Sequence, residues 1–180
     1  MPEGTREASV LIATSYQALN RELAGSRETR IADCTVLILF AGFYIEATLN
    51  YIANKTGKSK EMASFLGRPY PGMQDKLGWF YNEFIARSKA STKKQLYDNG
   101  IEQKLRRKFP GFARLYRFRN DISHGKINAS ATSVATAKVL RRRAKNLVGL
   151  LYAIPSRKGY KVPRLITYRA AIASLKGRYP

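Results

Sequence analysis

The only histidine of the chain, His124, follows Arg119 by five residues in the segment 119–124, which reads RNDISH. An imidazole exchanges protons near neutral pH, and a guanidinium binds a phosphate through two parallel hydrogen bonds while it stays charged. These two groups suffice for one known reaction, the cleavage of RNA by its own 2′-hydroxyl. A base removes the hydroxyl proton, an acid protonates the leaving 5′-oxygen, and a cation stabilises the phosphate.

These requirements suggest a role for each residue of the segment. His124 could act as the base or the acid, Arg119 could bind the phosphate, and Asn120 could orient the histidine or a phosphate oxygen. The sequence contains no cluster of carboxylates suited to Mg²⁺, so we expect metal-free cleavage, no metal site and no cofactor. The spacing alone also fits a second interpretation, a surface helix end that is capped by a histidine.

The segment 119–124 lies at the end of a helix predicted over residues 110–124. Pro110 suits the first turn of this helix, and Gly125 suits its C-terminal stop. At 100° per residue, Arg119 projects within an apolar arc, which is unusual for an arginine without a partner or a function. That arc consists of Phe112, Leu115, Phe118 and Ile122, and the adjoining side carries Tyr116, Asn120, Ser123 and His124.

Apolar periodicity predicts four further helices, over residues 5–24, 28–54, 74–88 and 132–153. Glycines and prolines indicate an irregular connection over 55–75, and the polar stretch 88–104 contains the turn signal Asn99-Gly100. We therefore expect an all-α fold, an up-and-down bundle of four to six helices. The bundle would occupy residues 1–153, and a basic extension would follow over 154–180, with a short hairpin or extended piece near 158–167 followed by a helix at 167–176.

The charge of the chain points to a polyanionic partner. The net charge is +21, and residues 101–180 contribute 20 basic side chains and only two acidic ones. Such one-sided charge favours binding to phosphates, whereas an anionic membrane surface and a solvated basic face are the alternatives. The residues predicted to bind RNA are Arg117, Lys126, Arg141, Arg142, Arg143 and Lys145.

The remaining composition favours the cytoplasm. A single cysteine, Cys34, excludes an internal disulfide. The N-terminus lacks the pattern of a signal peptide. The most apolar run, Val36–Ile45, has ten residues, fewer than the roughly 20 of a membrane span. We therefore expect no membrane association.

The segment Arg119-Asn120-Asp121-Ile122-Ser123-His124-Gly125 resembles the signature of the HEPN superfamily, in which an arginine precedes a histidine by four to six intervening residues. Asn120 matches the polar residue that often follows the arginine. The stretch from Phe43 to Asn50, with its embedded Glu46, is similar to the second helix of such domains. The resemblance covers about residues 5–153 and implies a bundle of four or five helices.

The resemblance also implies an activity and an assembly. Many HEPN domains are metal-independent endoribonucleases of toxin–antitoxin, phage-defence, CRISPR and RNA-processing systems. They commonly form homodimers, in which two Arg–His motifs face each other across one composite cleft. We therefore expect cleavage of single-stranded RNA to 2′,3′-cyclic phosphate ends, and an antitoxin or other regulator is a candidate partner. Candidates to support the site are Glu46, Ser123 and Tyr116.

The alternative is a non-catalytic member that binds RNA or DNA and uses the motif only for folding or dimerisation. Inactive relatives would typically have lost the arginine or the histidine, whereas this chain keeps both Arg119 and His124. Glu46 likewise has two interpretations. It is either a satisfied polar group in a buried helix or a residue that positions Arg119 or Asn120.

Overall fold

The computed structural model describes residues 3–20, 27–67, 71–126 and 133–165. Within these ranges the chain contains no strand, which confirms the all-α prediction. The described part holds eight helices rather than four to six: α1 (Glu3–Leu19), α2 (Arg27–Lys55), α3 (Ser59–Leu66), α4 (Met73–Phe84), α5 (Lys93–Asp98), α6 (Ile101–Lys108), α7 (Phe112–Ser123) and α8 (Val134–Arg157).

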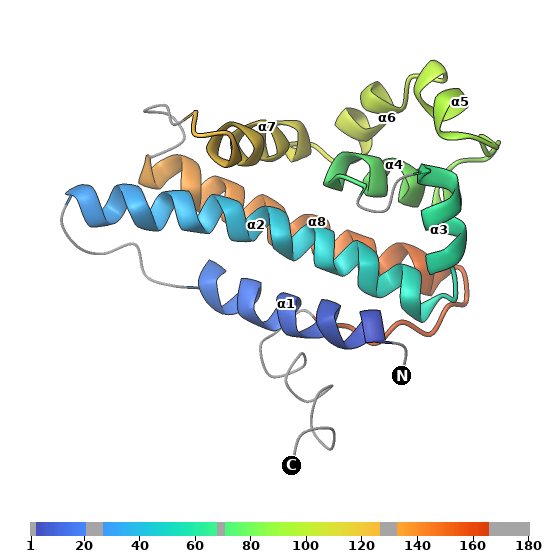
Figure 1. Cartoon of the computed structure of the whole chain (residues 1–180), viewed down its shortest axis with the longest axis horizontal. Coiled ribbons are helices and arrows are strands. Elements are labelled where there is room, and N and C mark those ends of the chain that lie inside the picture. The colour runs from blue at the N-terminus through green and yellow to red at the C-terminus, as the bar shows by residue number, and fades with distance from the viewer. Residues whose placement is uncertain (1–2, 21–26, 68–70, 127–132, 166–180) are drawn as a thin grey trace, which may run out of the picture.

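The two longest helices, α2 and α8, lie side by side in the same direction and form the centre of the molecule (Figure 1). Helices α1 and α7 run the opposite way and pack against this pair from two sides. Helix α4 also contacts α2, and the short helices α3, α5 and α6 surround α4 at one end (Figure 1). Helix α7 is therefore positioned by its contacts with both central helices, α2 and α8.

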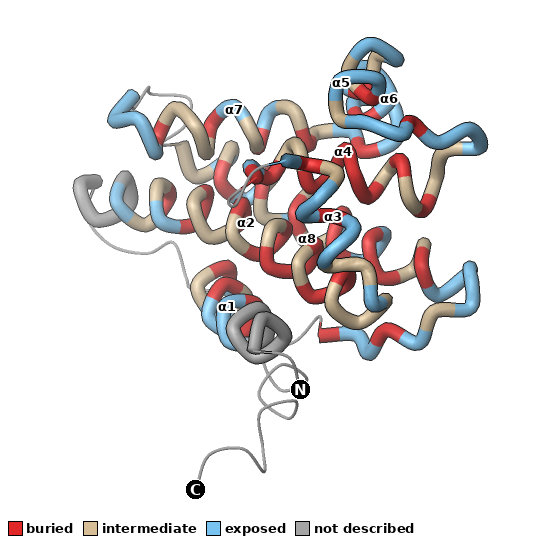
Figure 2. The backbone as a smooth tube through the Cα atoms, turned by 45° about the vertical axis from the view of Figure 1, so that its right-hand side comes forward, coloured by how far each residue is buried: buried red, intermediate tan, exposed pale blue. Residues whose placement is uncertain are grey.

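Helix α2 is the core of the bundle because it is apolar on several sides. An 18-residue window within its segment Ala32–Lys55 has a mean hydropathy of 1.6, and by length and composition this segment could cross a membrane. In the folded chain 67% of this window is buried, as for the core helix of a globular bundle, and Figure 2 shows buried residues along most of α2. The ten-residue run used in the sequence argument was thus only part of a longer apolar helix.

The irregular connection predicted for residues 55–75 was wrong, since this stretch contains α3. The turn predicted at Asn99-Gly100 is present, but it joins two short helices that were not predicted, α5 and α6. Local capping explains two of these short helices. The Thr92 side chain accepts a hydrogen bond from the Gln95 amide at the start of α5, and Gly100 takes a left-handed φ of 69° between α5 and α6. Helix α6 then buries only Ile101 and Leu105, so its sequence is dominated by polar residues.

Helix boundaries also differ from those predicted. Helix α4 ends at Phe84 rather than 88, and α8 continues through Pro155 to Arg157. The predicted domain boundary after residue 153 falls within α8. Residues 158–165 form no strand, although Val162 and Leu165 are buried in the core. The remainder of the predicted hairpin, the helix at 167–176 and the residues 21–24 at the end of the first predicted helix lie outside the described residues.

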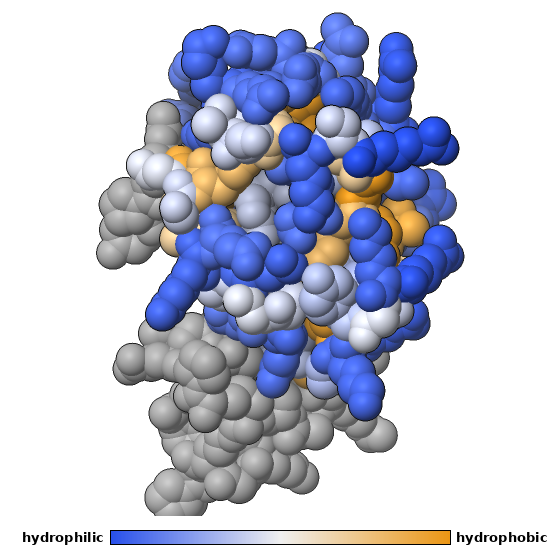
Figure 3. Space-filling model, turned by 90° about the vertical axis from the view of Figure 1, so that its right-hand side faces the viewer, coloured by the Kyte–Doolittle hydropathy of each residue, from blue (hydrophilic) through white to orange (hydrophobic). Residues whose placement is uncertain are grey.

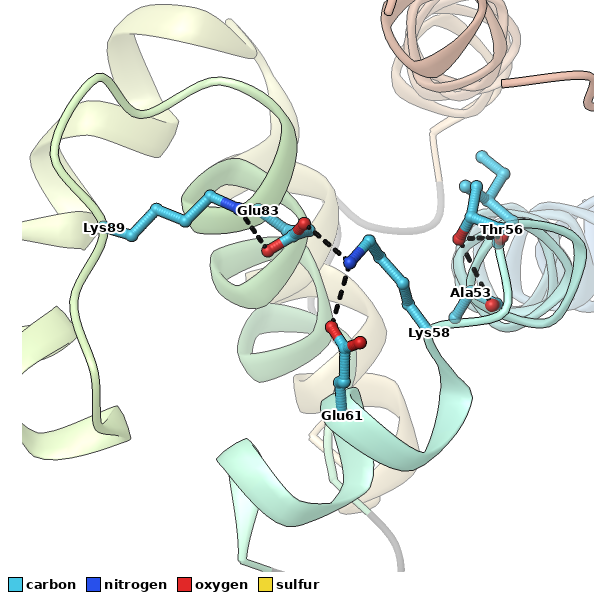
Figure 4. A network of polar contacts seen from close by, with 7 residues as sticks. Ala53, Thr56, Lys58, Glu61, Glu83 and Lys89 are labelled. Carbon is cyan, nitrogen blue, oxygen red and sulfur yellow. Dashed lines mark hydrogen bonds and ion pairs between the residues drawn. The ribbon is translucent and has the colours of Figure 1, made fainter. Parts of the chain in front are cut away.

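A polar network joins the end of α2 to α3 and α4 (Figure 4). Lys58 Nζ lies 2.9 Å from Glu61 Oε2 and 3.1 Å from Glu83 Oε1, and Lys89 Nζ lies 2.8 Å from Glu83 Oε2. Burial raises the pKa of Glu83, but the hydrogen bonds from Lys89 and Lys58 outweigh it, so this pKa lies below its ordinary value. The network therefore ties α4 to the start of α3, just after α2 ends.

Candidate functional site

Helix α7 is bounded by two glycines that take positive φ angles. Gly111 (φ 88°) is its N-cap, so Pro110 precedes the helix and does not lie in its first turn as predicted. Gly125 (φ 72°) follows the C-cap residue His124, and the Lys126 amide donates to the Asp121 carbonyl at 2.7 Å. This is the C-terminal stop predicted from Gly125.

Arg119 points from α7 toward α2. Its Nη2 lies 3.6 Å from Glu46 Oε2, its Nη1 donates to Asn120 Oδ1 at 3.1 Å, and its Cζ lies 5.8 Å from the centre of the Phe43 ring. Gly42 makes room for the side chain, because a Cβ on this glycine would lie only 2.9 Å from Arg119 Cγ. The arginine is thus fitted into a recess of the central helix.

One nitrogen of this arginine has no partner. Arg119 Nε is buried and forms no hydrogen bond, although 23% of the side chain as a whole is exposed. A buried donor without an acceptor is costly and rare in proteins. The charge of Arg119 is therefore paired with Glu46, whereas one of its hydrogen-bond donors, Nε, is left without an acceptor.

Glu46 forms a second ion pair, with a residue that the sequence argument missed. Its Oε1 accepts a hydrogen bond from Lys76 Nζ at 2.7 Å, and only 9% of the Lys76 side chain is exposed. Glu46 thus lies between two cations, one from α4 and one from α7. Lys76 lies 30 residues after Glu46 in the sequence, so no local pattern indicates that the two residues pair. The one available signal was the position of Lys76 among the apolar residues of α4.

The last two residues of the motif, Ser123 and His124, lie on the outer side of α7. His124 is exposed at the helix end, and Ser123 is exposed while its hydroxyl donates to the Arg119 carbonyl at 2.8 Å. In the part of the chain that the structure describes, no hydrogen bond or ion pair joins Arg119 to His124. The structure brings Arg119, Asn120 and Glu46 together and leaves His124 one turn away on the surface.

Two of the predicted RNA-binding residues hold α1 against α8. Arg141 Nη1 donates to the Leu19 carbonyl at 3.3 Å, and Lys145 Nζ donates to Asn20 Oδ1 at 2.6 Å and lies 5.0 Å from the centre of the Tyr16 ring. Burial, followed by the charge of Arg141, lowers the pKa of Lys145. Both cations therefore have a structural role at the C-terminal end of α1.

The remaining predicted RNA-binding residues lie on α7, just after it and on α8. The Arg143 side chain covers Gly111, where an added Cβ would lie 2.4 Å from Arg143 Cδ. Arg117, Arg142 and Lys126 are exposed. The ion pair of Arg117 with Asp121 is long, at 3.9 Å, and therefore weak. Exposed cations with weak partners are available to phosphates.

Tyr116, the last predicted support residue, stacks on Phe112 with 5.9 Å between the ring centres and 23° between the ring planes. It does not contact Arg119 through any hydrogen bond found among the described residues. Within the same residues, no three His, Cys, Asp or Glu side chains are grouped so that they could hold a metal ion.

No protein-family model, curated protein or solved structure matches this chain. The side chains of α7 and the residues that position them are therefore the basis for any functional proposal.

Proposed function

We propose that this protein is a metal-independent endoribonuclease of the HEPN type, which cleaves single-stranded RNA and leaves 2′,3′-cyclic phosphate ends. The observation that carries this proposal is the setting of Arg119. The arginine is paired with Glu46 and Asn120, its Nε has no partner, and His124 is exposed at the end of the same helix. An arginine needed only for packing would be expected to satisfy all its donors.

The proposed reaction assigns one task to each group. The ribose O2′ attacks the neighbouring phosphorus while its proton passes to a base, and the P–O5′ bond breaks as an acid protonates O5′. His124 takes one of these two proton transfers. Arg119 stabilises the negative charge of the phosphate, and Glu46 and Asn120 hold the guanidinium in place.

A single histidine cannot serve as base and acid in the same step, so we propose that a homodimer supplies the second one in a composite site. The exposed position of His124 at a helix end leaves it accessible to a second copy of the chain. The net charge of +21 fits an RNA substrate. We propose a cytoplasmic toxin or phage-defence enzyme, held in check by an antitoxin or another regulator.

Cleavage of a labelled single-stranded RNA in excess EDTA tests this proposal. The native protein is compared with Arg119→Ala and His124→Ala, which are purified in the same way. We expect only the native protein to cleave, with 2′,3′-cyclic phosphate at the new ends. Lys94→Ala is the control for a general loss of charge, because Lys94 is exposed and, among the described residues, pairs only with Asp98. Equal cleavage by the native chain and the His124→Ala variant would overturn the assignment.

A non-catalytic RNA-binding module is the second candidate, and one observation favours it. Arg119 contacts Glu46 but not His124, so its pairing also fits an arginine that stabilises the contact between α7 and α2. In that case all the proteins of the EDTA experiment would leave the RNA intact. Salt-sensitive RNA binding would then persist in the native protein and in both variants.

A further inference from the structure

A groove lies between α4, α6 and α7, along the part of α7 that precedes Arg119. Its volume is about 870 Å³, within the range of sites that bind small molecules or single nucleotides. Helix α7 forms one wall with Phe112, Ala113, Arg114, Tyr116, Arg117 and Phe118, and Gln74, Glu102, Leu105 and Arg106 form the other. Figure 3 shows the end of the molecule at which α6 lies. Most of this face is hydrophilic, and small hydrophobic patches are exposed between the hydrophilic side chains.

The charge of this groove suits an anion. Arg106, Arg114 and Arg117 line it, and all three are exposed. Among the described residues Arg106 and Arg114 have no ion pair, and the Arg117 contact with Asp121 is long, at 3.9 Å. The only carboxylate of the lining, Glu102, accepts a hydrogen bond from Gln74 at 3.0 Å. Three cations with little competition from carboxylates favour binding to phosphates.

The groove also offers planar apolar surfaces. Tyr116 is partly exposed and stacks on Phe112, and the guanidinium carbons of Arg114 and Arg117 lie 5.3 Å and 6.0 Å from the centre of the Phe118 ring. Unpaired bases stack on aromatic rings and on arginine planes, whereas the bases of a duplex are already stacked on each other. The combination of rings and cations therefore distinguishes a single strand from a duplex.

The position of the groove connects it to the proposed site. At 100° per residue, Ala113, Tyr116 and Arg117 lie on the same side of α7 as Asn120 and His124. Arg117 and His124 are two helical turns apart, or about 10 Å along the helix axis. A strand that occupies the groove and follows this side of α7 would thus reach His124 within a few nucleotides.

We propose that the groove between α4, α6 and α7 is a subsite for single-stranded RNA, which stacks an unpaired base beside Tyr116 and binds flanking phosphates through Arg106, Arg114 and Arg117. This subsite deepens the proposed function and rests on it, because it selects the strand that His124 cleaves. It also explains why basic side chains and aromatic rings alternate along the start of α7.

Binding of a short fluorescein-labelled RNA to the His124→Ala protein, measured by fluorescence anisotropy, tests the subsite. The double variant Arg106→Gln/Arg114→Gln is compared with Arg157→Gln/Lys158→Gln, which removes two exposed charges elsewhere. We expect the groove variant to weaken single-strand binding about tenfold or more. We also expect the slope of log Kd against log salt to fall by about 1.4, as for two lost phosphate contacts on a single strand. The control variant should change the affinity much less.

Two substitutions of one residue separate stacking from charge. Tyr116→Leu should weaken binding of single-stranded RNA about fivefold or more and leave binding of the same sequence as a duplex unchanged. Tyr116→Phe keeps the ring, so it should bind as the parent protein does, and thermal unfolding of both variants checks that they are folded. Equal losses for single strand and duplex would overturn the stacking subsite. Displacement of the RNA by an acidic peptide at equal charge concentration would also overturn it, in favour of a protein partner.

These outcomes are distinct from a failure of the proposed function. If the native protein leaves RNA intact in EDTA but the groove variants still lose single-strand affinity, the subsite stands and catalysis does not. If the native protein cleaves RNA but the groove and control variants bind alike, the subsite is overturned and the proposed function stands.

Discussion

At the scale of the residue, the recess that receives Arg119 depends on the absence of a side chain at Gly42. A glycine within a helix costs about 0.5–1 kcal/mol relative to alanine, so a glycine at the centre of α2 needs a reason. The reason is the stem of Arg119, whose Cγ would lie 2.9 Å from a Cβ at this position. Gly149 in α8 is a natural comparison, since a Cβ there would meet no atom within 4 Å.

We expect Gly42→Ala to displace the Arg119 side chain and to lower the RNA cleavage rate about tenfold to a hundredfold, as for a catalytic group misplaced by about 1 Å. Gly149→Ala should leave cleavage unchanged and raise the free energy of unfolding by about 0.5–1 kcal/mol. Initial cleavage rates and urea unfolding of both variants provide the measurement. Native cleavage rates in Gly42→Ala would show that the recess has no part in catalysis.

Glu46 offers a second test, because it holds one cation that is proposed to act on RNA and one that is not. Glu46→Gln and Lys76→Met both remove the ion pair between α2 and α4, and each should lower the free energy of unfolding by about 1–3 kcal/mol. Only Glu46→Gln also removes the carboxylate next to Arg119. We therefore expect Glu46→Gln to lose cleavage at least about tenfold at saturating RNA, whereas Lys76→Met retains most of it.

Cleavage at saturating RNA separates these two roles of Glu46. Equal losses in the two variants, at a temperature where both are folded, would mean that Glu46 acts only through the stability of the bundle. Circular dichroism at the assay temperature provides that check on folding.

At the scale of the element, the attachment of α4 determines where Lys76 and one wall of the groove lie. Glu83 anchors α4 through Lys58 and Lys89, and its pKa lies below the ordinary value of 4.5. A carboxylate whose pKa is lower in the folded than in the unfolded state stabilises the fold above the unfolded pKa. This stabilisation is lost as the pH falls from about 4.5 through the folded pKa.

We expect the free energy of unfolding of the native protein to fall more steeply than that of Glu83→Gln when the pH decreases from about 5 to about 3. At pH 7 the variant should be less stable, because Lys58 and Lys89 lose their carboxylate. Urea unfolding at several pH values is the measurement. Glu61→Gln is the control, since 61% of the Glu61 side chain is exposed and its loss should matter less. Parallel pH profiles of native protein and Glu83→Gln would contradict this account.

At the scale of the whole molecule, the sequence predicted the long helices and missed the short ones. Helices α2, α7 and α8 each carry an apolar pattern over three or more turns, and their existence was confirmed. Helices α5 and α6 are short and mostly polar, so their formation depends on the cap at Thr92 and on burial against α4. Ile101, Leu105 and Phe109, which are four residues apart, were the available signal for α6.

The same reasoning applies to the candidate site. The place of Arg119 in an apolar arc indicated that it needed a partner, because that information lies within one helix. The roles of Lys76 and Arg141 depend on contacts with distant segments, at Glu46 and Leu19, and no local pattern contains them. Charge alone indicated that Arg141 and Lys145 face phosphates, yet in the structure both bind the end of α1.

The parallel pairing of α2 with α8 has a consequence for the synthesis of the chain. Helix α2 ends at Lys55, whereas α8 spans Val134–Arg157, so the side of α2 that faces α8, unlike the side covered by α1, gains its partner roughly 80–100 residues later. At about 5–20 residues per second on the ribosome, this interval lasts about 4–20 s. During that time the nascent chain exposes a surface with the hydropathy of a membrane span. The growing polypeptide is therefore expected to be prone to aggregate until α8 appears, and a chaperone would bind it in this interval.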